Sequence, residues 1–547
     1  MTLRPLLCLT LLLSCALPAL GQETPDADLL ERIRKLEDEV KQLREAGQPA
    51  PKGESEPEGE EAPAPGESEP EKSDDDEEWV LAPEDVPPPP KHKASYGQAK
   101  DWKFPYGFVD QGKHPVFDLP LDMQLKLKGQ IRARAEFRDP SDYRIPGQAG
   151  RPATDNQSDA TDFALLRTRI TLDLKVHKNL RALIEIQDSR TWGDVAAGTD
   201  QAEVFVRQSF IEIAEPFEIP IWLWVGRWDV PQLGDGRLVS PLFFRNVTRS
   251  WDGVQLFGHF GGTTENPMVW ATAFAANVRE GAIFSADGDE NDDFWFNGLY
   301  VSFRGLKNSE FDGYLFNRYF SDRVFTSEKR TRLGDRKDYT LGFRTAHDFG
   351  VAGFTTELAW QYGDLAGDRV RAWAGAVRGW LEFEFDEVRT LEVAAEYAYA
   401  SGDRDPTDGK VQNFDPLVPQ NFRHHGNMNL VAWSNVHDVS LEATFTIVDG
   451  VRLLTEGHAF WLDKRKDGWF SVNHTLVRRD VTGRAASFLG TEFDLILEWT
   501  LFEEHLRLRA GYSHFWSGNY VRDTGRNTAG RSSGDMDYAF FEMRLSF

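Results

Sequence analysis

Residues 123–138 read MQLKLKGQIRARAEFR and alternate between apolar and polar side chains. One parity is apolar, with Gly129 as the only gap: Leu125, Leu127, Ile131, Ala133, Ala135 and Phe137. A period of two residues is typical of a β-strand with one apolar and one polar face. Globular strands usually have about 5 to 6 residues, whereas a tilted strand of about 10 residues can cross a bilayer. The sequence therefore predicts a membrane-spanning strand whose polar, mostly cationic face lines an aqueous lumen.

The same rhythm continues to the end of the chain. It predicts eighteen strands, at 123–138, 163–176, 180–190, 203–214, 220–228, 251–259, 268–279, 294–304, 310–320, 337–348, 352–363, 370–384, 388–400, 436–448, 451–463, 487–500, 505–516 and 536–547. Their even number favours an all-β fold, a transmembrane antiparallel β-barrel over residues 121–547.

The connections between these strands alternate in length. Links such as 177–179, 349–351, 385–387 and Asp449-Gly450 are tight. Between them lie long connections rich in Gly, Asp, Arg and Pro, at 139–162, 229–250, 280–293, 321–336, 401–435, 464–486 and 517–535. Short turns at one rim and long loops at the other are typical of outer-membrane barrels.

Composition agrees with an outer-membrane location. After the N-terminus, no apolar run approaches the roughly 18 residues that a membrane helix needs. The 17 Trp and 38 Phe suit interfacial girdles, although a soluble lectin-like β protein would look similar. The last strand ends in Phe547 and resembles the signal read by the outer-membrane assembly machinery. We expect outer-membrane lipid and the barrel assembly machinery as partners, and no nucleic acid.

The N-terminal part divides into three segments. Residues 1–21 have the charged start, apolar core and small-residue end of a signal peptide, although Cys15 could alternatively be lipidated. Residues 26–46 carry apolar residues at coiled-coil spacing, so this periplasmic helix either forms a homo-oligomer or frays. Residues 47–120 form an acidic, Pro-rich linker, predicted to be disordered in the periplasm.

Strand parity also assigns the side chains that face the lumen. The predicted substrate-binding residues are cations: Lys126, Lys128, Arg132, Arg134, Arg167, Arg169, Arg344, Arg378, Arg452, Arg507, Arg509 and Arg544. A guanidinium is always charged and donates to carboxylates in a forked geometry, so such a lining favours anions. The alternative is that these cations brace the wall against nearby carboxylates, namely Glu136, Asp173, Glu382, Glu456, Glu498 and Glu542. Parity does not orient Arg227, because both faces of its strand are apolar.

Enzymatic and metal-binding patterns are absent from the sequence. It contains no HExxH, CxxC, Walker or GxSxG motif, so we expect no catalytic residue, cofactor or metal. The acidic stretch Asp287–Asp293 could bind calcium but lacks the spacing of a full calcium loop, which favours a solvated loop. His424 and His425 are likewise expected to be solvated.

Several segments resemble the alginate export family of outer-membrane porins. They are Val225-Gly226-Arg227, Gly236-Arg237-Leu238, residues 245–254 (RNVTRSWDGV), residues 397–403 (YAYASGD) and residues 413–419 (NFDPLVP). The resemblance implies an eighteen-stranded barrel that exports alginate, a polyuronate, through an arginine-lined constriction. The N-terminal helix and linker look more like those of phosphate- or sugar-selective trimeric porins. A general or phosphate-selective porin therefore remains an alternative, and an outer-membrane enzyme or adhesin a second one.

Overall fold

The computed structural model describes residues 115–121, 123–139, 161–193, 202–262, 267–279, 294–328, 333–386, 388–472, 474–502, 504–525 and 534–547. The predicted signal peptide, the predicted helix at 26–46 and the linker up to residue 114 lie outside the described residues. Within the part that is described, no helix has the length and apolarity needed to span a membrane.

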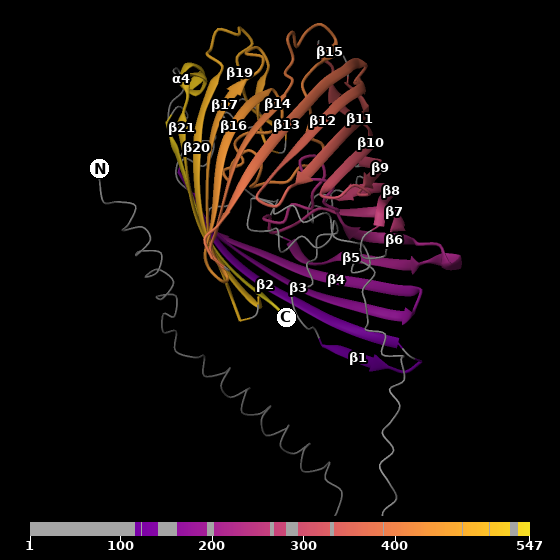
Figure 1. Ribbon diagram of the computed structural model, residues 1–547. Coiled ribbons are helices and arrows are strands. Elements are labelled where there is room, and N and C mark those ends of the chain that lie inside the picture. Colours follow the sequence, from indigo (N-terminus) through magenta and orange to yellow (C-terminus); the bar gives the residue numbers. More distant parts are fainter. Residues whose placement is uncertain are drawn as a thin grey trace, which may run out of the picture. The chain divides into compact units, whose positions relative to one another are not determined.

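Eighteen antiparallel strands close into one barrel, so the predicted fold class and strand number are confirmed (Figure 1). They are β2 (Met123–Asp139), β3 (Thr161–His177), β4 (Leu180–Gly193), β5 (Ala202–Ala214), β6 (Ile221–Asp229), β7 (Ser250–Gly262), β8 (Pro267–Arg279), β9 (Phe294–Phe303), β10 (Ser309–Thr326), β11 (Leu333–Asp348), β12 (Ala352–Leu365), β13 (Asp368–Glu384), β14 (Thr390–Ala400), β16 (Val436–Val448), β17 (Val451–Leu462), β20 (Phe488–Leu501), β21 (Leu506–Ser517) and β22 (Met536–Ser546).

Pairing of the first and last of these strands closes the barrel. β2 pairs with β3 on one side and with β22 on the other, in a register that runs from Gln130 opposite Ser546 to Asp139 opposite Asp537. Closure removes the free sheet edges that a membrane does not tolerate. In Figure 1 the indigo strands at the start of the barrel therefore adjoin the yellow strands at its end.

The start of β2 extends beyond β22 and takes a separate partner. The short strand β1 (Val116–Leu119) folds back on it, with Val116 opposite Lys126 and Leu119 opposite Met123. The predicted disordered linker, 47–120, is therefore wrong at its C-terminal end. The physical reason is that residues 123–126 at the start of β2, which lie beyond the end of β22, would otherwise have no neighbour on that side.

Four further elements and one short helix lie in the connections between the barrel strands. β15 (Lys410–Val411) pairs in parallel with β13, and β18 (Gly468–Ser471) forms a hairpin with β19 (Thr475–Arg479). The 3-10 turn η2 (Pro216–Glu218) joins β5 to β6, and α4 (Asn519–Gly525) follows β21.

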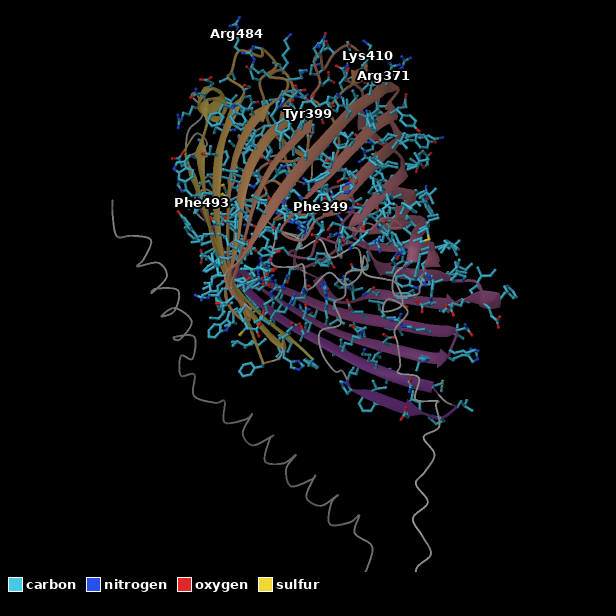
Figure 2. All side chains as sticks on the ribbon, in the orientation of Figure 1. Phe349, Arg371, Tyr399, Lys410, Arg484 and Phe493 are labelled. Carbon is cyan, nitrogen blue, oxygen red and sulfur yellow. The ribbon has the colours of Figure 1, made fainter. Side chains whose placement is uncertain are left out.

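Apolar side chains face outward and charged side chains face inward, as the alternation predicts. On β2, Ile131 and Phe137 are 42% and 38% exposed, whereas Arg132 and Arg134 are 2% and 3% exposed. Phe493, on β20, also points outward (Figure 2). This inverted arrangement suits a surface that lies against lipid.

The gap at Gly129 in the apolar face is filled by the C-terminus. Gly129 and Phe547 exchange backbone hydrogen bonds of 2.6 and 2.9 Å. A Cβ atom at position 129 would overlap the ring of Phe547. The last residue therefore covers the glycine of the first barrel strand and completes the outer surface at the closing seam.

Turn lengths alternate between the two ends of the barrel, as predicted. One end has only short links, such as 178–179 between β3 and β4 and 449–450 between β16 and β17. Long connections, such as 230–249 and 401–435, lie at the other. Two details differ: β10 and β11 are longer than expected, which shortens the predicted loop 321–336, and β12 joins β13 through Ala366-Gly367 alone at the long-loop end.

Exposed aromatic rings gather toward both ends of the strands. Trp192, Trp360 and Trp373 lie toward the long-loop end, and Phe349 and Trp499 lie toward the short-turn end. Amphipathic rings at both interfaces are typical of outer-membrane barrels. Tyr399 and Phe349, both labelled in Figure 2, mark these two levels.

Candidate functional site

The candidate site is the charged inner surface of the barrel. Each of the twelve predicted cations lies at an inward-facing position of its strand. Nine are buried: Lys126, Lys128, Arg132, Arg134, Arg167, Arg169, Arg344, Arg378 and Arg507. Arg452, Arg509 and Arg544 are partly buried. The structure therefore places these side chains on the inner face of the barrel, and what they contact there depends on the tertiary structure.

Four of the arginines form one row across the closing seam. Arg132 lies opposite Arg167 of β3 and opposite Arg544 of β22, and Arg544 lies opposite Arg507 of β21. The prediction that the first two strands share a wall with the arginines of 505–516 is thus confirmed by the register. Like charges directly opposite each other destabilise a sheet, so this row concentrates positive charge at an energetic cost.

The next row along the same strands alternates in sign. Arg134 lies opposite Glu542, Glu542 opposite Arg509, and Arg509 opposite Glu498 of β20. The ion pairs are 3.4 Å for Arg134–Glu542 and 3.3 Å for Arg509–Glu498. Glu542 is also 3.7 Å from Arg132, and Glu498 pairs with Arg507 and Arg452. Two carboxylates are therefore shared among several guanidinium groups.

The inner side of β2, β3, β21 and β22 is strongly cationic overall. In the described structure these four strands direct three carboxylates inward, those of Glu136, Asp173 and Glu542. They direct eleven cations inward: Lys126, Lys128, Arg132, Arg134, Arg138, Arg167, Arg169, Lys175, Arg507, Arg509 and Arg544. We call this surface the basic wall.

The long connection 230–249 folds into the barrel and rests on the basic wall. Arg132 donates to the carbonyl oxygens of Phe243, at 3.1 Å, and of Arg245, at 2.9 Å. Arg167 donates to the same Arg245 carbonyl at 3.1 Å. Arg134 donates to the Phe244 carbonyl and stacks on the Phe244 ring, 3.8 Å from its centroid. The predicted anion-binding arginines therefore also anchor this loop, which the sequence did not indicate.

A second connection, 401–435, packs against the first inside the barrel. The Ser240 amide donates to the Val418 carbonyl at 2.9 Å, and the Val418 amide donates to Leu238 at the same distance. Arg249 donates to the Pro419 carbonyl at 3.0 Å. Together these contacts hold the two connections as one unit, which we call the inserted loops.

Buried ion pairs attach the inserted loops to the opposite side of the barrel. Asp415 accepts from Arg318 at 2.9 Å and from Arg336 at 2.8 Å. Burial disfavours its charge, but the two guanidinium groups outweigh burial and hold the pKa of Asp415 well below its usual range. Asp235 binds Arg344 at 2.7 Å, and its pKa is likewise lowered despite burial, chiefly by that arginine.

Several predicted cations contact carboxylates of the wall, as the bracing alternative proposed. Arg344 also binds Glu310, at 2.8 Å, and Asp312, at 2.7 Å. Arg378 is 3.0 Å from both Glu392 and Glu442. Arg452 pairs with Glu498. For these three residues bracing is the interaction that the structure shows.

Two other expectations change in the folded barrel. The prediction that His424 and His425 are solvated is wrong: His425 Nδ1 lies 2.8 Å from Asp438, and His424 Nε2 lies 2.8 Å from the Asp235 carbonyl. Burial, with nearby arginines, lowers the pKa of His424 well below its usual value. Both changes arise because their loop is inserted into the barrel.

Arg227, which parity did not orient, binds Asp252 at 2.5 and 2.7 Å.

Sequence reasoning missed buried cations that lie on strands with unclear parity or in loops. They include Arg181, Arg207, Arg237, Arg249, Arg318 and Arg336. Arg237 pairs with Glu396, although the two are 159 positions apart in sequence. Alternation indicated that some of these positions face inward. An ion pair between residues far apart in the chain, however, has no local pattern in the sequence.

Solved structures of porins resemble the chain at low sequence identity. OccAB4 of Acinetobacter baumannii has a TM-score of 0.50 at 11% identity, covering 77% of this chain and 98% of that one. OccK9 (OpdG) of Pseudomonas aeruginosa gives 0.48 at 13% identity, with 77% and 98% coverage. OccK2 (OpdF) of the same organism, solved with glucuronate, gives 0.46 at 13% identity, with 77% and 98% coverage.

A comparison with curated proteins returned no match. The model of the alginate export family matches residues 123–535, which include seventeen of the eighteen barrel strands in full. The match contains all the segments on which the resemblance rested. It also contains the arginines of β2, β3 and β21 that form most of the four-arginine row. The chain belongs to the alginate export family, whose barrel fold it shares.

Proposed function

We propose that the barrel is an outer-membrane channel that passes anionic solutes, and that its preferred solute is an alginate-like polyuronate. The observation that carries the proposal is the basic wall, above all the row formed by Arg167, Arg132, Arg544 and Arg507. Membership of the alginate export family supports the transport role.

The basic wall also runs along the strand direction. On β2 the inward face carries the cations Lys126, Lys128, Arg132, Arg134 and Arg138, interrupted by Gln130 and Glu136. Alternate residues of a strand are about 6.8 Å apart, so a polyanion can move from one cation to the next. Several exchangeable contacts favour entry of an anion without binding it too tightly to leave.

The inserted loops lie on this wall, so solute passage depends on their position. Arg132 and Arg167 now donate to loop carbonyls, which are weaker acceptors than carboxylates. A passing carboxylate can replace these carbonyls as the acceptor. We therefore expect the loops to restrict the conductance of the resting channel.

Ion selectivity of the purified barrel in a planar bilayer tests the proposal. The reversal potential in a salt gradient should indicate anion preference, and Arg507→Gln with Arg544→Gln should move it toward equal permeability. Arg378→Gln is the matched control, because Arg378 pairs with wall carboxylates on β14 and β16 and should change selectivity less. A cation-selective parent, or selectivity that survives the double change, would contradict the proposal.

Solute block distinguishes the proposed substrate from the alternatives. Oligouronates should interrupt the current at lower concentrations than neutral oligosaccharides of equal length. Block by inorganic phosphate alone would instead favour a phosphate-selective porin, and no block by either would favour a general porin. Hydrolysis of the added oligouronate would point to the enzyme alternative.

The remaining partners are proposals of the same kind. We propose that the barrel assembly machinery recognises β22 with its terminal Phe547, which lies on the outer surface. We also propose that the predicted helix at 26–46, which lies outside the described residues, is periplasmic and forms a homo-oligomer. Crosslinking of the full chain, compared with a chain lacking 26–46, tests the oligomerisation.

A further inference from the structure

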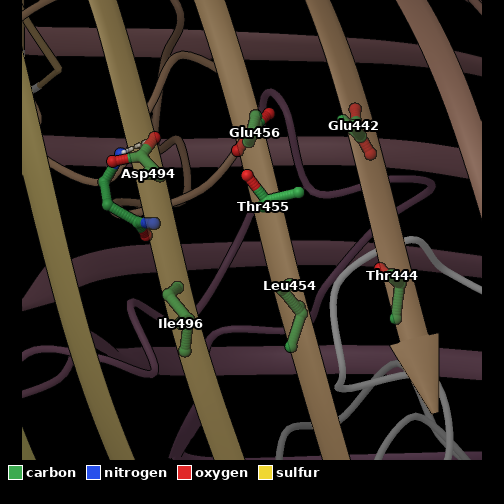
Figure 3. Close-up of a pocket in the computed structure, with 8 residues that line it drawn as sticks. Glu442, Thr444, Leu454, Thr455, Glu456, Asp494 and Ile496 are labelled. Atoms are coloured by element: carbon green, nitrogen blue, oxygen red, sulfur yellow. Dashed lines mark hydrogen bonds between the residues drawn. The ribbon is translucent and has the colours of Figure 1, made fainter. Parts of the chain in front are cut away.

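A second charged surface, opposite in sign to the basic wall, lies on β16, β17 and β20. Glu442 lies opposite Glu456, and Glu456 lies opposite Asp494, so three carboxylates stand side by side on neighbouring strands. Figure 3 shows these three side chains at one level of the wall, around a small cavity that Asn427 also lines. Adjacent carboxylates repel each other unless a cation or shared protons compensate them.

An imidazole completes the cluster. His458 Nδ1 lies 3.0 Å from Asp438, and Nε2 lies on the side of Glu456, 2.8 Å from its carboxylate. Donor atoms of Glu456, His458 and Asp494 all lie within 4.8 Å of one another. Histidines that bind metals almost always donate their other ring N–H to a carboxylate or carbonyl, which orients the ring. Asp438 occupies that position here.

Two carboxylate oxygens of these residues lack hydrogen-bond partners. Glu456 Oε2 and Asp494 Oδ1 are buried without one, in side chains that are 5% and 1% exposed. Buried polar atoms without a partner are costly and call for a ligand that the protein atoms alone do not supply. By contrast, Glu442 is held by Arg378, at 3.0 Å. Two of the unsatisfied atoms in this region therefore belong to residues of the donor cluster.

We propose that Glu456, His458 and Asp494 bind one divalent transition-metal ion, of the Zn²⁺ or Mn²⁺ class. One imidazole and two carboxylates suit these ions better than Ca²⁺, which prefers oxygen ligands alone. Asp438 positions the imidazole. The site is distinct from the basic wall and does not depend on the transported solute.

The ion would also connect the wall to an inserted loop. The Asn427 amide donates to Asp494 Oδ2 at 3.3 Å, and the Met428 amide donates to Glu492 at 2.8 Å. The loop backbone thus already binds one proposed ligand, Asp494, and the neighbouring carboxylate of Glu492. A bound cation would fix Asp494 in the position that receives this loop, so metal binding should stabilise the inserted state.

These donors form no metal motif in the sequence, because they come from three strand positions that only the barrel register brings together. Glu456 and His458 are two residues apart on β17, and Asp494 is on β20.

The competing interpretation is a metal-free cluster, in which His458 forms an ion pair with Asp438 and Glu456 and the acids share protons.

Metal titration of the folded, tag-free chain tests the proposal. After removal of metal with a chelator, isothermal calorimetry should show one Zn²⁺ per chain, with weaker Mn²⁺ binding and Ca²⁺ weaker still. His458→Gln and Asp494→Asn should each weaken Zn²⁺ binding at least about tenfold. Glu498→Gln is the control: it is an equally buried carboxylate on β20, but it pairs with Arg452 and Arg507 and should leave binding unchanged.

A measurement on the unaltered chain covers the case in which a variant does not fold. Pulsed electron paramagnetic resonance of bound Mn²⁺ should detect nitrogen coupling from a directly bound imidazole. The proposal is overturned by the absence of Zn²⁺ and Mn²⁺ binding, by binding that both variants retain, or by bound Mn²⁺ without nitrogen coupling. Ca²⁺ binding as tight as Zn²⁺ binding would also overturn it.

Discussion

Replacing Arg132 by Met should release the inserted loop 230–249 from the basic wall. The guanidinium donates to the carbonyls of Phe243 and Arg245 and to the side chain of Asn246, at 3.1, 2.9 and 3.3 Å. Methionine keeps much of the aliphatic length but donates no hydrogen bond. The change therefore removes these donors with little loss of packing.

The size of the effect follows from the number of lost hydrogen bonds. Each hydrogen bond to a charged group contributes about 1.5 to 3 kcal/mol, so the three together contribute about 4.5 kcal/mol at the low end of that range. Arg134 and the contacts with Val418 still hold the loop, so the free energy of docking falls by less than this sum. Since 1.4 kcal/mol corresponds to a factor of ten, we expect the open population of the loop to rise at least tenfold.

Limited trypsin digestion measures that population. Trypsin can cut after Arg237, Arg245 and Arg249 when the loop leaves the barrel, and the rate follows the open fraction when reclosing is fast. Arg181→Met is the control, because Arg181 binds Asp173 on β3, at 2.6 and 2.8 Å. A folded Arg132→Met barrel that is cut no faster than the parent chain would refute the anchoring role.

Three further predictions concern the seam and the second inserted loop. Gly129→Ala should lower the free energy of unfolding by about 1–3 kcal/mol through overlap with the Phe547 ring, and adding Phe547→Ala should recover part of this loss in a double-mutant cycle of urea unfolding. Burial and the neighbouring Glu328 raise the pKa of Asp403 to about 7, so the docked loop 401–435 favours the protonated acid. Docking is strongest below the unfolded pKa of about 3.9 and is lost as pH rises through 7. Hydrogen-exchange protection in this loop, measured relative to the intrinsic exchange rate at each pH, should therefore be lower at pH 8 than at pH 5, and Asp403→Asn should abolish that difference in protection. Asp415→Asn removes a charge shared by two buried arginines and should cost about 3–5 kcal/mol of loop docking, seen as faster proteolysis of 401–435; an unchanged rate would show that this contact is dispensable.

The strands could be predicted because their signal is local. A barrel strand in a membrane must place apolar side chains on alternate positions, and each such position is visible in the sequence whatever the strand pairs with. Residues 123–138 show this directly, and all eighteen predicted strands are present. Strand ends were less accurate in β10 and β11, because the end of β10 and the start of β11 extend beyond the apolar alternation.

The candidate site was predicted only in part. Strand parity predicted which arginines face inward. It did not predict that Arg132 and Arg134 bind the backbone of a loop more than 100 residues away. The loop 230–249 carries no strand or helix pattern, so nothing local indicated that it enters the barrel. The pair His424-His425 was predicted to be solvated for the same reason.

Local patterns in the sequence were enough to predict the number of strands, the lipid-facing side of the clearly alternating ones, the sorting of long and short connections and the positive character of the inner face. These properties depend on the period of single segments. The four-arginine row, the positions of the inserted loops and the cluster around His458 became visible only in the folded barrel. Those depend on strand register and on loop insertion, and both are set by the energy of contacts between residues far apart in the chain, which no local pattern encodes.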